Sequence, residues 1–250
     1  MEELSIHFTP NAGDPKQGTL TFESEVEGIA MTYANLYRRC LLQSVPSYSV
    51  CAIKCSYMNG AILEVCKSPF QVIPDLMGSL LEITNILHNA VFEVETEKEA
   101  FTLTTVLEGK VMLSDICTSP NTKIIDAENV KLLSEDKELA TIVGERKITL
   151  ELLFVKGIGY RIRDDNVATL KNYCGQTPDD WWIIMDSQHK GVLKVGYKED
   201  KKLDKQIMTL DIVCNRGTVV DALTSCSNLI REVTEKVDKS LTENGDNGNV

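Results

Sequence analysis

Residues 18–50 read GTLTFESEVEGIAMTYANLYRRCLLQSVPSYSV and place a strand, a helix and a second strand in one continuous segment. Residues 18–23 alternate in side-chain polarity and are rich in threonine, which is typical of a β-strand. Apolar residues then recur at helical spacing from Ala30 to Gln43, and Pro46 ends the helix. Residues 47–57 alternate again, so the segment predicts a strand–helix–strand unit.

The helix at 30–43 carries two faces of different chemistry. Its apolar face is built from Ala30, Ala34, Tyr37 and Leu41, with Tyr33, Leu36 and Cys40 beside them. The opposite stripe consists of Asn35, Arg38, Arg39 and Leu42. Two adjacent arginines beside a large apolar residue either form a solvated helix surface or mark a contact with a partner, and the residue pattern alone leaves both readings open.

The middle of the chain is predicted to be mostly β-structure. Asn59-Gly60 indicates a hairpin turn into a return strand at 62–66. A second helix is predicted over 73–87, with Pro74 in its first turn. Beyond it, strands are predicted at 90–95, 101–106, 110–113, 122–126, 146–155, 181–185, 192–197 and 206–214.

The last predicted helix begins at Thr218, where Thr218 and Asp221 form a capping-box pattern with Asp in place of Glu. Six apolar residues follow at heptad spacing: Val219, Leu223, Cys226, Ile230, Val233 and Val237. Such a seam suits pairing with another helix. Residues 239–250 are polar and rich in Gly and Asn, and we expect them to be disordered.

Charge and hydropathy exclude several partners. The 250 residues include 26 Lys and Arg against 37 Asp and Glu, a net charge of −11. Non-specific binding of nucleic acid or of an anionic membrane needs clustered positive charge, so the chain is a poor general ligand for either. No apolar run approaches the roughly 20 residues of a membrane-spanning helix, and the N-terminus has no signal-peptide pattern.

Motifs for catalysis or metal binding are missing. The eight cysteines are scattered without a CxxC pair, and we interpret them as reduced thiols, most of them in the core. The three histidines lie far apart, and no GxSxG, HExxH or P-loop is present. Gly157-Ile158-Gly159 lacks the third glycine of a dinucleotide fingerprint and is expected to be a tight bend after a long strand. These patterns favour an interaction protein over an enzyme.

Four segments, taken in order, resemble the N-terminal assembly domain of the α subunit of bacterial-type, multi-subunit RNA polymerase. Residues 18–50 are similar to a strand followed by TLGNALRRxLLSSxPGxAV, and residues 155–160 to (K/R)GRGYV. Residues 182–186 and 192–197 are similar to IPIDAxFSPVxKVxY, and residues 207–217 with the helix after them to KLxxEIxTxGTIxPxEAL. In the first segment the matching positions are Thr32, Asn35, Arg38, Arg39, Leu41, Leu42, Ser44, Pro46 and Val50.

The chain departs from the family pattern at a few positions. Two glycines of the first helix region are Ala30 and Ala34 here, the arginine inside GRGY is Ile158, and a lysine of the second helix is Thr84. Because the chain ends at Val250, we expect no counterpart of the family's C-terminal DNA- and activator-binding module. The resemblance therefore indicates a divergent member.

The resemblance implies an α+β fold in two parts. A dimerisation domain made of a sheet and long helices would comprise residues 1–46 and 189–238. A β-rich domain inserted between these segments would comprise residues 47–188, and residues 239–250 would be a disordered tail.

The resemblance also implies a role. The face formed by Asn35, Arg38, Arg39 and Leu42 would dock the β subunit, and the same region of a second protomer would face β′. The seam from Val219 to Val237 would hold a homodimer or a pair with an α-like chain. The subunit would carry no catalytic residue, cofactor or metal of its own, since nucleotidyl transfer belongs to the large subunits. It would meet DNA only through the complex and have no membrane partner.

Three points stay open at this stage. The chain could be one half of an unlike α-type heterodimer, as in archaeal and eukaryotic polymerases. It could instead be a small-molecule enzyme that uses the polar segment 163–180 and Trp181-Trp182 as a pocket. The bacterial cytoplasm, at the nucleoid, is the simplest location, with a plastid or another organelle as the alternative.

Overall fold

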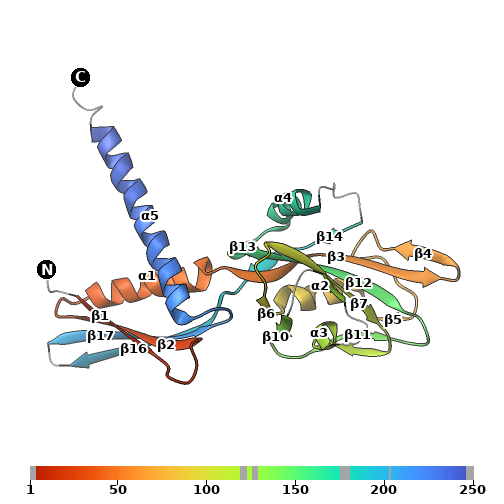
Figure 1. Ribbon diagram of the computed structural model, residues 1–250, viewed down its shortest axis with the longest axis horizontal. Coiled ribbons are helices and arrows are strands. Elements are labelled where there is room, and N and C mark those ends of the chain that lie inside the picture. Colours follow the sequence, from red (N-terminus) through yellow and green to blue (C-terminus); the bar gives the residue numbers. More distant parts are fainter. Residues whose placement is uncertain (1–3, 119–122, 126–128, 175–180, 203, 246–250) are drawn as a thin grey trace. The chain divides into compact units, whose positions relative to one another are not determined.

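The computed structural model describes residues 4–118, 123–125, 129–174, 181–202 and 204–245. The chain divides into two compact units (Figure 1). Unit 1 is formed by both ends of the chain, Met1–Val45 and Gly191–Val250, and unit 2 is the continuous segment Pro46–Lys190. Both units combine antiparallel sheets with helices, which confirms the predicted α+β class.

Unit 1 is a four-stranded antiparallel sheet with two helices. The strand order is β1 (Ser5–Pro10), β2 (Gln17–Ser24), β17 (Lys205–Cys214) and β16 (Val192–Lys202). Helix α1 (Ile29–Ser44) lies across this sheet and contacts the first turns of α5 (Val219–Gly245), whose remaining length extends away from the sheet (Figure 1). The core comprises the inward side chains of β2, β16 and β17 together with Ala30, Ala34 and Leu41 of α1.

Local sequence explains both ends of α1. Gly28 precedes the helix with φ of 89°, a conformation that glycine adopts without strain, and its N–H donates to Oε1 of Gln206 at 3.0 Å. At the other end Val45 is extended because it precedes Pro46, which disfavours the helical conformation in the residue before it.

Unit 2 is built on a larger antiparallel sheet. Its order is β14 (Ile183–Ile184), β3 (Ser47–Asn59), β12 (Ile148–Gly157), β7 (Ala100–Leu107) and β9 (Lys123–Ile125), with β4 (Ile62–Val65) also pairing with β3. Phe154 lies at its centre, stacked on Phe101 with ring centroids 5.0 Å apart and edge-on to Phe92 at 5.2 Å. This aromatic cluster belongs to a core that also takes in α2 (Leu80–Asn89).

Smaller elements complete unit 2. One short sheet pairs β6 (Phe92–Glu95) with β10 (Asn129–Leu132), and another pairs β13 (Gly159–Arg161) with β15 (Ser187–His189). In a third, β11 (Glu138–Ile142) lies between β5 (Leu76–Met77) and β8 (Lys110–Met112). The remaining helices are α3 (Asp115–Thr118) and α4 (Arg163–Cys174).

The second helix begins later than the sequence predicts. Pro74 lies in a loop instead of in a first turn, and positive φ angles at Asp75 and Gly78, 70° and 96°, stop a helix from passing through them. The helix starts after Ser79, whose hydroxyl accepts from the Glu82 N–H while the Glu82 carboxylate accepts from the Ser79 N–H.

Three other segments differ from expectation. Strand β1 was not predicted, because its side chains are almost all exposed and show no alternation in burial. The polar segment 163–180 contains α4, which buries Leu170 and Asn166, while residues 175–180 lie outside the described residues. The last helix continues to Gly245, beyond the expected start of a disordered tail at 239, and residues 246–250 are not described.

Candidate assembly surface

The stripe predicted on the first helix lies along one flank of α1. Ala30, Ala34 and Leu41 turn into the core of unit 1, and the stripe runs beside this buried face, with Arg38 nearest to β16 of the sheet. Asn35, Arg39 and Leu42 are exposed, and Arg38 is half-buried. We call the set Asn35, Arg38, Arg39 and Leu42 the α1 ridge.

Tyr197 of β16 extends the α1 ridge onto the sheet. The Asn35 side chain and the Arg38 guanidinium both lie close enough to the Tyr197 hydroxyl to favour its ionised form. Burial and the Glu199 carboxylate outweigh both effects and raise the pKa of Tyr197, so the hydroxyl is protonated at neutral pH. The result is a mixed surface of two arginines, an amide, a phenol and a leucine.

Sequence reasoning missed Tyr197 as a site residue. It closes the KVGY part of the third matched segment, but only the packing of α1 across β16 brings it beside the helix. Arg38 also has a buried Nε without a hydrogen-bond partner among the described residues. A partly covered guanidinium with donor capacity to spare is suited to binding carbonyl or carboxylate oxygens of a partner.

The six seam residues of α5 divide into two groups. Val219 and Cys226 are fully buried and Leu223 is partly buried, all within the core of unit 1. At this level α5 contacts α1, where the Tyr37 and Ser227 hydroxyls lie 3.1 Å apart and the Cys40 thiol donates to the Cys226 carbonyl. The first half of the seam therefore holds the helix to its own unit.

The second half of the seam faces solvent. Ile230 is partly buried, whereas Val233 and Val237 are 52% and 50% exposed. Leu241, one turn further on, is 65% exposed, so an apolar stripe continues along a helix whose residues 231–240 are all exposed. A long, unaccompanied helix with such a stripe is typical of a surface that a partner helix covers.

The capping box predicted at the start of α5 is confirmed. The Asp221 N–H donates to the Thr218 hydroxyl at 3.1 Å, and the Asp221 carboxylate accepts from the Thr218 N–H at 2.9 Å. These hydrogen bonds lower the pKa of Asp221, and they fix the direction in which the helix leaves the sheet.

Unit 2 contains a serine–histidine pair that resembles a catalytic dyad. His189 Nδ1 lies 2.9 Å from the Ser47 carbonyl, so Nδ1 carries the proton and Nε2 accepts from the Ser187 hydroxyl at 3.1 Å. Asn166 donates to Ser187 at 3.0 Å. All of these side chains are buried, and burial lowers the pKa of His189 to about 4. The pair is a structural network, because no substrate can reach it.

The glycine motif at 157–159 supports this network. Gly157 ends β12, and a Cβ placed there would lie 2.7 Å from the His189 ring, so a larger residue has no room. Gly159 has φ of 62°, which makes the predicted bend after the long strand.

Other titratable candidates stay apart. His7 lies on β1 of unit 1, while His88 and His189 make separate contacts in unit 2. No group of three or more His, Cys, Asp or Glu side chains that could hold a metal is found among the described residues. In that same part of the chain, no helix has the length and hydropathy to cross a membrane.

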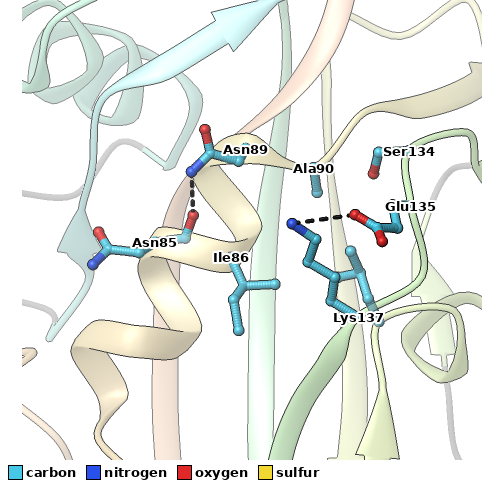
Figure 2. A pocket seen from close by; sticks show the side chains of 8 residues that line it. Asn85, Ile86, Asn89, Ala90, Ser134, Glu135 and Lys137 are labelled. Carbon is cyan, nitrogen blue, oxygen red and sulfur yellow. Dashed lines mark hydrogen bonds and ion pairs between the residues drawn. The ribbon is translucent and has the colours of Figure 1, made fainter.

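The cavities of the two units are shallow. One of about 290 Å³ in unit 2 lies between the end of α2 and the segment 134–137, where Glu135 and Lys137 form an exposed ion pair at 3.4 Å (Figure 2). Ile86 and Ala90 line its apolar side. A second hollow, in unit 1, lies beside the start of α1 between Leu4 and Tyr33. Ser134 also lines the first cavity, and its hydroxyl accepts a hydrogen bond from the Val91 N–H at 3.2 Å.

Comparison with known proteins finds similarity to RNA polymerase subunits. The family model described as the RNA polymerase Rpb3/Rpb11 dimerisation domain matches residues 23–232. The chain is 24% identical to the DNA-directed RNA polymerase subunit alpha of Aster yellows witches'-broom phytoplasma, over 87% of this chain and 61% of that protein. It is 28% identical to the subunit of the same name from Aquifex aeolicus, over 79% of this chain and 57% of that protein.

A third relative extends the match further along this chain. The DNA-directed RNA polymerase subunit alpha of Desulforamulus reducens is 26% identical over 97% of this chain and 72% of its own length. The chain spans 61% and 64% of the length of the first two curated relatives that it matches.

Proposed function

The chain belongs to the RNA polymerase Rpb3/Rpb11 dimerisation-domain family, and from that premise we propose that it is an α-type subunit, a dimeric scaffold on which the two large subunits of a DNA-directed RNA polymerase assemble. The observation that carries this proposal is the uncovered apolar stripe of α5, in the same unit as the α1 ridge. One surface suits a second α-type chain and the other suits a large subunit.

In this proposal the two units have different roles. Residues 1–46 and 189–238 are the dimerisation domain, which corresponds closely to unit 1, and residues 47–188 are the inserted β-rich domain, which corresponds closely to unit 2. The distal seam residues Val233 and Val237 pair with a second copy of the chain or with an α-like partner. Because the chain has a net charge of −11, DNA is reached only through the complex.

The α1 ridge is proposed to dock the β subunit in one protomer and to face β′ in the other. Arginine is suited to this role because its planar guanidinium binds oxygens bidentately while its stem lies on apolar surface. Tyr197 adds an aromatic residue of the kind enriched at the centres of interfaces. The proposed location is the bacterial cytoplasm, at the nucleoid, or an organelle with such a polymerase.

Co-expression with the two large subunits tests the ridge. Arg39→Ala is expected to lower the recovered complex about tenfold or more, because truncating an interface anchor costs roughly 2 kcal/mol or more of binding energy. Arg163→Ala, which removes another exposed arginine from α4 in unit 2, is the matched control and should assemble normally. Normal assembly of Arg39→Ala would refute the assignment of Arg39 as a docking residue.

A further inference from the structure

Two buried cysteines face each other at the edge of the main sheet of unit 2. In the pairing of β3 with β4, Tyr57 lies opposite Glu64 and Ser56 opposite Val65. The next step of that register places Cys55 opposite Cys66, and the Cys66 N–H donates to the Cys55 carbonyl at 2.8 Å. Both thiols are free and fully buried in the same core.

The geometry of the pair fits a covalent bond. Opposed residues on antiparallel strands have Cβ atoms about 4.5–5.5 Å apart, and disulfides span Cα separations of about 4.4–6.8 Å. The neighbouring Cys66 thiol and burial raise the pKa of Cys55, whereas the neighbouring Cys55 thiol lowers the pKa of Cys66, so Cys66 is the better nucleophile of the two.

The position of β4 at the edge of the sheet allows a small reagent to reach Cys66. The strand has four residues, pairs only with β3 among the described strands, and exposes Ile62 and Leu63 by 68% and 61%. A short edge strand separates from its sheet at lower cost than the unit unfolds. Such an opening would expose Cys66, which follows β4 directly.

We propose that Cys55 and Cys66 are a reactive dithiol that a low-molecular-weight disulfide, such as oxidised glutathione, converts into an intramolecular disulfide. The Cys66 thiolate attacks one sulfur of the small disulfide, whose S–S bond breaks and releases one thiolate. Cys55 then loses its proton to solvent and attacks Cys66 Sγ, which releases the second small thiol. Two electrons pass from the protein thiols to the small disulfide. This chemistry does not depend on the proposed role in assembly.

The bond would pin the β3–β4 hairpin. A ring closed from Cys55 to Cys66 prevents β4 from separating, so the amide hydrogen of Cys66 should exchange with solvent at least about tenfold more slowly after oxidation. The reduced hairpin opens and the oxidised one does not, so the oxidation state of the two cysteines controls whether β4 can separate from β3.

The test uses the full chain with oxidised glutathione. Intact mass should fall by two hydrogen atoms, and non-reducing digestion should yield one cross-linked species that joins Cys55 to Cys66. Cys55→Ser should accumulate a stable glutathione adduct on Cys66, whereas Cys66→Ser should form none at this edge. Cys117→Ser, which removes a partly exposed cysteine from α3, is the control and should still form the disulfide.

The wild-type chain keeps the test decisive if either serine variant fails to fold. Incubation continues until the Cys66 amide has exchanged in a parallel reduced sample. Free thiols at both positions after that time, a lasting glutathione adduct on the wild-type chain, or a disulfide between other cysteines would overturn the proposal. A Cys66 amide that never exchanges would do the same, because the proposed access needs β4 to open.

Discussion

Units 1 and 2 bury their apolar surface in different ways. Unit 2 surrounds Phe92, Phe101 and Phe154 with strands and α2, and its buried Ser187–His189 pair is fully hydrogen-bonded. Its exposed apolar residues, such as Ile62, Met77 and Tyr160, are spread over several short strands and loops. Unit 1 leaves a helix stripe uncovered along α5. This continuous stripe on one helix supports the proposal that a partner chain covers α5 of unit 1.

Charging the uncovered stripe should have the largest effect. Val233→Asp combined with Val237→Asp is expected to raise the dissociation constant of the dimer by at least about 100-fold, because burial of each valine contributes roughly 1.5 kcal/mol and buried carboxylates add a penalty. Sedimentation velocity over a concentration series measures the change.

Val143→Asp is the matched control for that experiment, since Val143 is an exposed valine of unit 2. It should leave self-association unchanged. If the chain pairs with an unlike α-type partner, the same variants are compared in that pair. If the double variant associated as strongly as the wild type, the α5 stripe would not be a partner surface, and the proposed difference between units 1 and 2 would be wrong.

Acid should destabilise unit 2 through His189. Its pKa is lowered from 6.5 to about 4 in the folded chain, so between these values the unfolded state binds more protons. The contribution is complete above pH 6.5 and is lost as the pH falls to 4, by about 3 kcal/mol in total. Both tryptophans lie in unit 2, so their fluorescence during urea unfolding reports on this unit.

Comparison of the wild type with His189→Asn tests whether His189 causes this loss of stability at low pH. The variant should be less stable at pH 7, because it loses contacts to Ser47 and Ser187, and its stability should fall less between pH 7 and pH 4 than that of the wild type. Carboxylates with lowered pKa values, such as Asp186, affect both proteins alike. Parallel pH profiles for the two proteins would contradict the role given to His189.

Removing a helix cap should have the smallest effect. Ser79→Ala deletes the hydroxyl that caps α2, and the free energy of unfolding of unit 2 should fall by about 1 kcal/mol. Ser5→Ala on the exposed strand β1 of unit 1 should leave the tryptophan transition unchanged. A shift caused by Ser5→Ala would mean that the tryptophan signal does not separate the units.

Patterns with a clear period were readable from the sequence. The buried face of α1, the cap of α5 and most strands follow from alternation or helical spacing. Tyr33 and Leu36, predicted beside that buried face, are exposed instead, because the sheet covers a narrower part of the helix. The start of α2 was predicted wrongly, because Pro74 was interpreted as part of its first turn and the capping-box pattern of Ser79 and Glu82 was not considered.

Contacts between distant parts of the sequence could not be predicted. The approach of Tyr197 to the α1 ridge, and of Ser47, Asn166 and Ser187 to His189, depends on how strands and helices pack, which no local pattern encodes. The division of the α5 seam into a covered and an uncovered half likewise depends on where the sheet ends.

Site-specific photo-cross-linking from Leu42 tests the central claim most directly. A photoreactive amino acid placed there in the α1 ridge should, in the assembled polymerase, attach to a large subunit. The same amino acid at Ile6, on the exposed strand β1, serves as the reference position. Cross-links from position 42 only to a second copy of this chain, or to no protein in an intact complex, would contradict the scaffold role proposed for this surface.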